Sequence, residues 1–497
     1  MIDYGIVGAG QDHTVKQAGK RPGDETFREA RMLRETGDLP TETDVLILGA
    51  GIAGHCAALA AAEAGARVLL LEKSSQPGGS SAIAGGAFAF CGTDEQKAAG
   101  ISDSIEDFRN ALLKTGKNKN NREMLELFLS RQEGAYRFLR SQGIGFELLP
   151  SPPPEMARVH LTGTGRAVTQ LHMKVQAHPG IDFFSKSAGA RLIRNPETGR
   201  VDACIVMFGD RETEIRARRG IVLATGGFSR SAELLGVFAP ELEFGVKHGG
   251  VANTGDGLIM ACDLGAGQAD LGYVAGSFGG AIRNYPGATA KADEIPPLIF
   301  AFQDAAIMVN KYGKRFVDEA QSYKALSSIG MAQPDGVAFQ VFDETMMAAS
   351  LGDTSVNNYH EALLGGYIKK AETIRELAGA MQIDPDVLEN TVSTYNDGAA
   401  AGTDEQFGRT RGLRPIDNPP YYVAATANAI TSTYGGVAVD GQLAVVDWFG
   451  VPIDGLYAAG EVAGGFHGAG YYSASSLSSS ATFGLEAGRN AAKGSGH

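Results

Sequence analysis

The first regular pattern of apolar and polar positions begins near residue 44. Residues 45–48 form a short apolar run that predicts a buried strand, and the alanine-rich residues 52–64 predict a helix that ends at Gly65. A second apolar run at 68–71 predicts a second buried strand. Strand, helix and strand in this order predict a βαβ unit, and therefore a parallel sheet.

Further patterns extend this plan along the chain. Residues 103–143 repeat with helical periodicity, and the prolines at 152–154 end that segment. The apolar run at 220–224 predicts another strand of the same sheet. From about 238 to 428 the chain consists of glycine- and aromatic-rich loops and short strands, with a helical patch near 372–395. This change of pattern predicts an inserted domain.

These patterns divide the chain into four parts. We expect an N-terminal arm at 1–40, the first part of the sheet domain at 41–237, the inserted domain at 238–428, and the rest of the sheet domain at 429–497. The arm has a helical-looking piece at 25–35. It also contains the glycine run at 5–10, which we assign to turns because no alanine-rich helix follows it.

Composition narrows the function without identifying it. The 497 residues carry a formal net charge of −13, which disfavours nucleic acid and anionic membranes because no basic run offsets it. The start has no positively charged region, and no apolar run is long enough to span a bilayer, so we expect a cytoplasmic protein. The four cysteines form no CxxC or CxxCH pattern, which argues against zinc, iron–sulfur clusters and c-type haem, and we expect no metal site. The chain therefore shows no internal chain of redox centres, and any redox reaction that it catalyses would need a separate partner to supply or accept electrons.

The strongest chemical signal is the glycine motif between the first strand and the first helix. In Gly49-Ala-Gly51-Ile-Ala-Gly54 the first glycine permits a tight turn, the second lets the backbone approach a pyrophosphate, and the third lets helix and sheet pack closely. Glu72 ends the second strand, where its carboxylate can bond a ribose hydroxyl. A glycine turn without a ligand is the alternative. The combination with Glu72 favours a dinucleotide site.

A second element, Gly455-Leu-Tyr-Ala-Ala-Gly460-Glu461, favours FAD over NAD. With it, the chain resembles the fumarate reductase and succinate dehydrogenase flavoprotein family, which has the 3-ketosteroid dehydrogenases as relatives. The resemblance covers most of residues 41–497 through GAGIAG, EKSSQPGGSSAIAGG, LATGGF, ANTGDG, VNKYGKRFVDE, TYGG and GLYAAGE. It implies an α/β fold: a Rossmann-like FAD-binding domain built on a doubly wound parallel sheet, with an inserted α+β capping domain for the substrate.

The resemblance also implies how FAD binds. Glu461 is expected to bond the ribityl chain, and a last helix from about Ser480 to point its N-terminus at the flavin pyrimidine, stabilising negative charge on reduced flavin. Gly79 stands where membrane-bound relatives carry the histidine that links FAD covalently, so we expect noncovalent FAD. No further motif indicates a nicotinamide domain. The expected cofactor-binding residues are Gly49, Gly51, Ala53, Gly54, Glu72, Lys73, Gly79, Ser80, Ser81, Gly85, Gly86, Ala224, Thr225, Gly226, Gly227, Asp256, Gly460, Glu461, Ser476 and Leu477.

Three positions separate the chain from the soluble fumarate reductases that it resembles. Their proton-delivering arginine is replaced by Tyr323, the histidine of their HTMGG segment by Ser432, and the arginine of their GANRLGG segment by Tyr471. Cations that grip two carboxylates are thus exchanged for neutral phenols and hydroxyls, which favours a less charged substrate. The spacing Tyr471-x-Ser473 looks most like the enzymes that desaturate the C4–C5 bond of 5α-reduced 3-ketosteroids.

The resemblance to those dehydrogenases implies catalytic roles. Tyr471 polarises the ketone, and Tyr323, helped by Ser473, removes the neighbouring proton while flavin N5 takes a hydride from the next carbon. Each residue has a structural alternative. Tyr323 would pack at a domain seam, and one of Tyr471 and Tyr472 is expected to face the core.

Other polar and aromatic side chains are open to two interpretations. Arg315 and Glu319 are expected to form a structural ion pair near the site. Phe88 and Phe90 line a pocket or fill the core. A lone histidine is weak evidence of function, and of His160, His178, His248 and His467 the best candidate is His467, which we expect beside the flavin without a catalytic role.

Three functions remain open at this point. The first is a dehydrogenase that desaturates the bond beside a ketone, the second a fumarate-reductase-like alkene reductase, and the third a non-catalytic flavin-binding or electron-carrier protein. The replaced cations favour the first. The substrate is a 3-ketosteroid or a small ring such as 4-oxocyclohexanecarboxylate, which would need a cation from Arg283, Lys247 or Arg166. The external electron acceptor is a quinone, oxygen or an electron-transfer protein.

Overall fold

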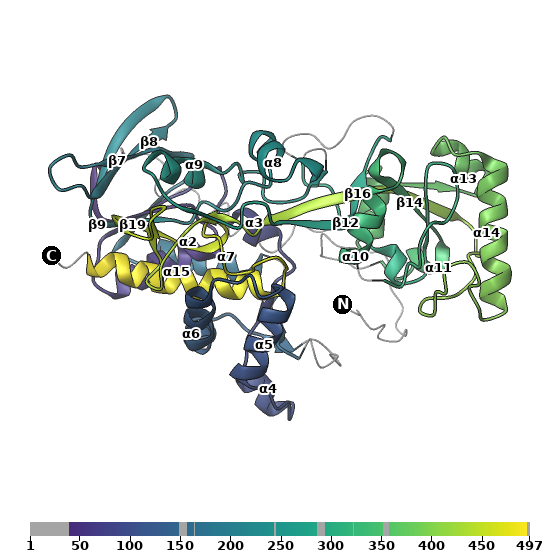
Figure 1. Ribbon diagram of the computed structural model, residues 1–497, viewed down its shortest axis with the longest axis horizontal. Coiled ribbons are helices and arrows are strands. Elements are labelled where there is room, and N and C mark those ends of the chain that lie inside the picture. The colour runs from purple at the N-terminus through teal and green to yellow at the C-terminus, as the bar shows by residue number, and fades with distance from the viewer. Residues whose placement is uncertain are drawn as a thin grey trace.

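The computed structural model describes residues 39–148, 157–163, 165–242, 245–285, 294–321, 323–350 and 357–494. They form two lobes that are joined by two long antiparallel strands, β12 (Val274–Ile282) and β16 (Tyr421–Thr433) (Figure 1). The N-terminal arm, including the glycine run at 5–10 and the helical-looking piece at 25–35, lies outside the described residues. Strand β16 crosses residue 428, where the inserted domain is expected to end.

The larger lobe is built on an eight-stranded sheet in the order β18-β19-β9-β1-β2-β6, which β7 and β8 extend from β9. The four pairings from β19 to β6 are parallel, with Val45 opposite Val68 and Leu46 opposite Ile221. The predicted parallel sheet is thereby confirmed. Its strands are β1 (Glu42–Leu48), β2 (Val68–Leu71), β6 (Ile181–Phe184), β7 (Ser187–Arg194), β8 (Val201–Phe208), β9 (Arg211–Leu223), β18 (Ala444–Val446) and β19 (Pro452–Ala458).

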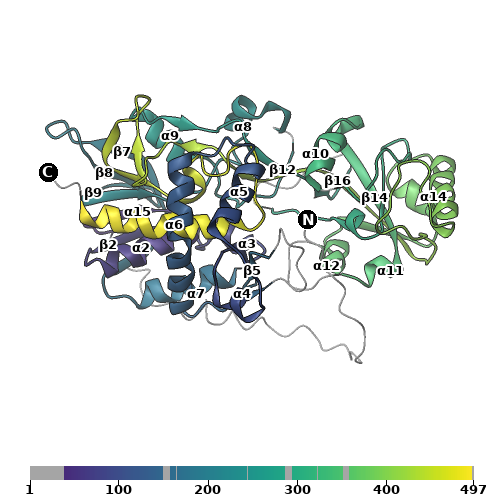
Figure 2. The same cartoon turned by 60° about the horizontal axis from the view of Figure 1, so that its bottom comes forward.

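Two helices pack tightly together over this sheet, α2 (Ile52–Glu63) and α15 (Ser475–Lys493). Residues Ile52–Ala62 are all buried, as expected of a helix that is apolar on every side. The contact requires glycine, because a Cβ on Gly488 would lie 2.2 Å from the carbonyl oxygen of Ala57. Figure 2 shows α6 (Arg122–Ser141) crossing α15.

Smaller elements complete the larger lobe. A three-stranded sheet has the order β3-β5-β4, and β11 pairs with β17. Among the described helices, none combines the length and apolar character needed to cross a membrane. The remaining elements are α3 (Gly79–Ile83), β3 (Ala87–Ala89), α4 (Asp94–Ala98), α5 (Ile105–Thr115), β4 (Glu147–Leu148), β5 (Val159–Leu161), α7 (Arg166–Ala177), α8 (Ala232–Phe238), η2 (Pro240–Leu242), α9 (Asp256–Asp263), β11 (Gln268–Ala269), β17 (Gly436–Val437) and η5 (Gly460–Val462).

The smaller lobe has a six-stranded, mostly antiparallel sheet centred on β16, with apolar cores of its own. The helical patch predicted near 372–395 appears as two helices, α13 and α14, which pack on it (Figure 1). This lobe is the expected α+β unit. Its further elements are β10 (Val246–Lys247), η3 (Ala301–Gln303), β13 (Ile307–Val309), α10 (Tyr323–Met331), η4 (Pro334–Gly336), β14 (Val337–Asp343), α11 (Glu344–Met347), α12 (Tyr359–Leu364), β15 (Ile368–Ala371), α13 (Ile374–Ala380) and α14 (Pro385–Ala400).

Candidate cofactor and substrate site

A cavity of about 410 Å³ begins at the carboxyl ends of the parallel strands and continues to the junction of the two lobes. Its wall includes Leu48 at the end of β1, Leu71 at the end of β2, and Ser277 and Thr431 on the two joining strands. This is the place where open α/β sheets bind ligands, outside the carboxyl ends of their strands. The wall therefore combines a nucleotide-type site with a second region that belongs to the lobe junction.

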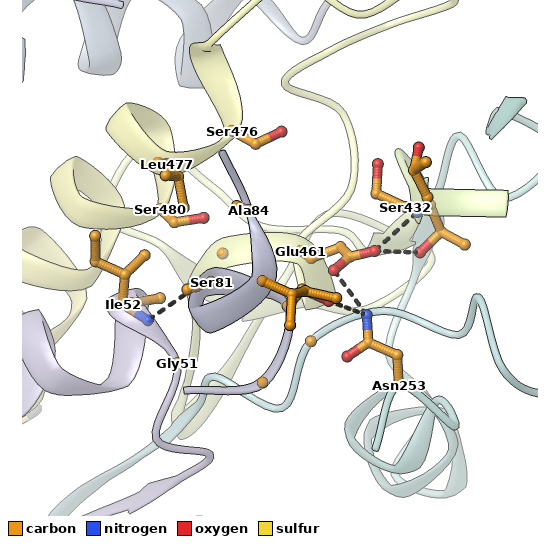
Figure 3. Close-up of a pocket in the computed structure, with 18 of the residues that line it drawn as sticks. Gly51, Ile52, Ser81, Ala84, Asn253, Ser432, Glu461, Ser476, Leu477 and Ser480 are labelled. Carbon is orange, nitrogen blue, oxygen red and sulfur yellow. Dashed lines mark hydrogen bonds between the residues drawn. The ribbon is translucent and has the colours of Figure 1, made fainter. Parts of the chain in front are cut away.

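The predicted glycine motif forms the turn at the start of α2. Gly49 has φ +104°, and a Cβ there would lie 2.3 Å from the carbonyl oxygen of Ala224. Gly51 is the N-cap of α2 and lines the cavity, so the first turn of this helix faces it. The Ile52 N–H donates to Ser81 Oγ at 3.2 Å (Figure 3). A helix N-terminus with bare backbone at its start is suited to an anionic pyrophosphate.

Glu72 and a lysine–aspartate pair mark the opposite side of this part of the cavity. Glu72 is buried and accepts hydrogen bonds from the backbone N–H groups of Ala50 and Ser74, at 3.0 and 2.8 Å. Lys73 Nζ lies 2.6 Å from Asp256, the first residue of α9. The hydroxyl of Thr225 is buried at the cavity wall and has no protein partner among the described residues, so a bound group is needed to satisfy it.

Glu461 lies deep in the cavity wall between the two lobes. Its carboxylate accepts from Asn253 Nδ2 at 2.9 Å and from the Thr433 N–H at 2.8 Å (Figure 3). Burial raises the pKa of this carboxyl, and the two donors partly oppose that rise. Gly227 supports the same group, because a Cβ on it would lie 2.6 Å from Glu461 Oε1.

The N-terminus of α15 also faces the cavity, through Ser476, Leu477 and Ser480 (Figure 3). The predicted start near Ser480 is wrong, because α15 begins at Ser475. The run of serines lowers helix propensity, yet these hydroxyls bond carbonyls within the helix, as Ser478 Oγ does to the Ser475 oxygen at 3.0 Å. Tertiary packing against α2 supplies the remaining stability.

The structure places the cofactor-binding residues expected from sequence around this one cavity, with three exceptions. Gly54 packs under the turn, where a Cβ would lie 1.9 Å from the Gly49 oxygen. Gly86 lies against Gly163, and Gly227 lies behind Glu461. These three glycines act through close packing instead of lining the cavity.

Tyr471 and Ser473 line the cavity, whereas Tyr472 points into the protein. The Tyr471 ring lies 6.2 Å from that of Tyr434 and 5.5 Å from that of His467. Burial raises the pKa of Tyr471, which keeps its phenol protonated at neutral pH. The Tyr472 hydroxyl accepts from Arg158 at 3.2 Å.

Tyr323 is the first residue of α10, and its side chain lies outside what the structure describes. The segment before it is anchored by a buried cluster of four charges. Arg315 donates to Glu319 and to Asp404, with closest distances of 2.8 and 2.9 Å, and Arg409 reaches Glu319 at 3.4 Å. Within the described chain none of these four lines the cavity, so the expected structural ion pair is part of a larger network.

The remaining aromatic and histidine candidates from the sequence lie partly away from the cavity and partly on its wall. Phe88 and Phe90 stack at 5.8 Å and belong to the core. His160 is buried and bonds Thr93 at 2.8 Å, while His178 accepts from the Gly180 N–H. His467 lines the cavity as expected. His248 lines it as well, although no sequence motif singles this histidine out.

The sequence missed part of the wall at the lobe junction. Tyr434 belongs to the TYGG segment and Asn253 to the ANTGDG segment, so both motifs carried a usable signal. Ser277, Gln303 and Asn357 also line the cavity. They come from separated segments that only the folded chain brings together.

Comparison with known proteins decides the identity of the site. The FAD binding domain family matches residues 44–477. The chain belongs to this family. It is 30% identical to a probable fumarate reductase of Shewanella frigidimarina over 480 residues, which is 95% of this chain and 79% of that protein. It is 25% identical to a 4-oxocyclohexanecarboxylate 2-dehydrogenase of Sinomonas cyclohexanicum, over 92% of this chain and 88% of that protein.

Solved structures of flavoproteins share this fold. The open conformation of a flavocytochrome c3 fumarate reductase superposes with a TM-score of 0.79 at 29% identity, covering 97% of this chain and 82% of that one. The 3-ketosteroid-Δ4-(5α)-dehydrogenase of Rhodococcus jostii RHA1 gives 0.68 at 26% identity, covering 92% and 98%. This flavoprotein is thus an FAD-dependent oxidoreductase of the fumarate reductase type that acts on CH–CH bonds.

The residues around the cavity fit FAD. Bare backbone at Gly51 and the N-terminus of α2 suit a pyrophosphate, and the carboxylates of Glu72 and Glu461 on the cavity wall would suit hydroxyl groups of the adenosine and ribityl parts. The N-terminus of α15 provides a positive helix end for the flavin. The lobe junction is then left for the substrate.

Proposed function

We propose that this flavoprotein desaturates the carbon–carbon bond beside the carbonyl of an uncharged cyclic ketone. One observation carries the proposal. Among the described residues that line the cavity, none is an arginine, and the one lysine, Lys73, is paired with Asp256 on the nucleotide side. A dicarboxylate such as fumarate would bring two charges to a wall of hydroxyls, phenols and imidazoles, and the loss of their hydration would not be repaid.

The three cations that the sequence suggests for a substrate carboxylate do not line the cavity. Arg283 pairs with Glu294 and stacks over the Tyr367 ring at 4.7 Å. Lys247 and Arg166 do not line the cavity either. The described wall thus favours a neutral ring over 4-oxocyclohexanecarboxylate, whose carboxylate would need one of these cations.

Two tyrosines have different roles in the proposed reaction: Tyr471 polarises the ketone and Tyr323 removes a proton. FAD, when bound, would supply the acceptor for the hydride that leaves the substrate's β-carbon. Tyr471 keeps its proton, because burial raises its pKa, and donates a hydrogen bond to the ketone oxygen. Tyr323 takes the proton from the carbon beside the carbonyl, and Ser473 assists it. Loss of this proton and the hydride leaves the new double bond.

The reverse direction is the alternative, an FAD-dependent reductase of an enone. The match to a probable fumarate reductase favours it, and the same residues serve both directions, with Tyr323 returning the proton. In the direction we propose, an external acceptor would have to take up the two electrons removed from the substrate, and we propose a quinone, oxygen or an electron-transfer protein for this role.

Anaerobic mixing tests the proposal. Oxidised holoenzyme is mixed with cyclohexanone, 4-oxocyclohexanecarboxylate, a 5α-reduced 3-ketosteroid and succinate while the visible flavin band is followed. We expect bleaching with a neutral ketone and none with succinate. The reduced enzyme is mixed with the matching enones and with fumarate. Faster reoxidation by fumarate than by every enone would overturn the neutral-ketone assignment.

A further inference from the structure

His248 directly follows β10 and forms part of the cavity wall at the lobe junction. Its side chain is buried from outer solvent, and its backbone N–H donates to the Ile430 oxygen of β16 at 3.0 Å. Its ring Nδ1 lies 2.8 Å from the carbonyl oxygen of Pro296. This contact ties His248 to the segment that carries Leu298 and Phe300, two other residues of the cavity wall.

The contact with Pro296 fixes the proton of the imidazole. A carbonyl oxygen can only accept, so Nδ1 must carry the hydrogen. The ring is held neutral, because burial and the nearby Arg230 lower its pKa. In a neutral imidazole with its hydrogen on Nδ1, Nε2 is an acceptor.

Nε2 is open to the cavity. Within the described parts of the chain it has no hydrogen-bond partner. It nevertheless keeps some access to solvent, unlike the fully enclosed polar atoms that lack a partner. Since the residue is only 6% exposed, this remaining access is to the cavity that it lines. The wall thus presents a fixed hydrogen-bond acceptor whose direction is set by the Pro296 contact.

The acceptor lies away from the end of the cavity that holds Tyr471. His248 is bonded to β16 at Ile430, whereas Tyr471 lies against Tyr434, four residues further along the chain. The three steps of extended strand from Ile430 to Thr433, where β16 ends just before Tyr434, span about 10 Å. A ligand whose carbonyl meets Tyr471 therefore approaches His248 with a different part of its skeleton.

We propose that His248 is a specificity-determining residue that accepts a hydrogen bond from a hydroxyl group of the substrate, on the side away from the ketone. The inference rests on the proposed function and narrows it to ring ketones that carry such a hydroxyl. A neutral ring that lacks the donor leaves Nε2 dehydrated and unpaired, and so binds less well.

Two substitutions separate the two ring nitrogens. His248→Asn keeps an amide N–H near the position of Nδ1, for Pro296, and deletes the acceptor at Nε2. His248→Gln places its amide near the position of Nε2, keeps an acceptor there, and deletes the Pro296 contact. The FAD content of both variants is measured first, because equal content shows that the flavin site is intact.

The test is binding of enone products to oxidised holoenzyme, which avoids turnover in the proposed direction. Two matched pairs are titrated against the flavin spectrum: cyclohexenone with and without a ring hydroxyl, and a 3-keto-4-ene steroid with and without a hydroxyl on its far ring. We expect the parent to prefer the hydroxylated member of at least one pair by about five- to tenfold, the size of one hydrogen bond. His248→Asn should lose this preference and His248→Gln retain it.

The outcomes are distinct. Parent protein that binds both members of each pair equally, or His248→Asn that keeps the preference, rejects the role of His248 and leaves the neutral-ketone proposal standing. Parent protein that binds none of the four compounds rejects the proposed substrate class, and the role of His248 with it.

Discussion

The neighbouring side chains Tyr471 and Tyr472 have different surroundings and should respond differently to the loss of one oxygen. Tyr471→Phe removes the proposed donor to the ketone, and loss of one such donor costs about 10²- to 10³-fold in kcat. Tyr472→Phe should keep turnover but leave Arg158 without one buried partner, lowering stability by about 1–3 kcal/mol. Anaerobic flavin reduction and thermal unfolding of both variants check this. Slow turnover in Tyr472→Phe with Tyr471→Phe unaffected would reverse the assignment.

Tyr323 is the proposed general base, and its substitution should affect flavin reduction and hydrogen exchange together. Tyr323→Phe should lower flavin reduction by about 10²- to 10⁴-fold, the usual contribution of a general base. Exchange of the ketone's α-hydrogens with deuterium oxide should disappear as well, because both need proton removal. Binding of enone products should be unchanged, since the ring is kept. Parent-like flavin reduction in this variant would show that another group is the base.

Packing of α15 on α2 sets the positions of two helix N-termini that face the cofactor cavity. A Cβ on Gly488 would collide with the Ala57 carbonyl, so Gly488→Ala should separate the helices and cost about 1–3 kcal/mol, with weaker FAD binding. The matched control is Gly134→Ala on α6, where a Cβ meets nothing within 4 Å. That change should be neutral or stabilise by up to about 1 kcal/mol, because alanine favours helix. Thermal unfolding with and without FAD measures both, and a Gly488→Ala variant as stable as its control would contradict the packing argument.

Local pattern was sufficient for elements whose signal lies within a few residues. The first strand, helix and strand were predicted because apolar periodicity and the glycine turn are local, and all three are confirmed. The start of α15 was wrong because its serines indicate a loop, and only packing on α2 reveals the helix. The wall at the lobe junction could not be predicted, because Ser277 and Thr431 reach the same cavity only through the pairing of β12 with β16, strands about 150 residues apart in sequence. Local sequence carries no signal for that pairing.

FAD binding should be reversible for the whole molecule. Gly79 lines the cavity where a covalent link would need a histidine, so acid or denaturant should release all FAD from the chain. Added FAD should also raise the melting temperature, because it binds only the folded state. Ultrafiltration of acid-treated protein followed by flavin absorbance measures the release. Yellow colour that stays with the denatured chain would contradict noncovalent binding.

The buried charge cluster before α10 restricts how this family can vary. The two positive charges of Arg315 and Arg409 are balanced by the carboxylates of Glu319 and Asp404, and all four side chains are buried. Removing one member leaves an uncompensated buried charge, which costs about 3–5 kcal/mol, whereas exchanging opposite charges together for apolar groups costs far less. The two arginines and their two acids should therefore covary across homologous sequences. A lineage that loses Asp404 alone must pass through an intermediate of sharply reduced stability, so these positions should be inherited as a set.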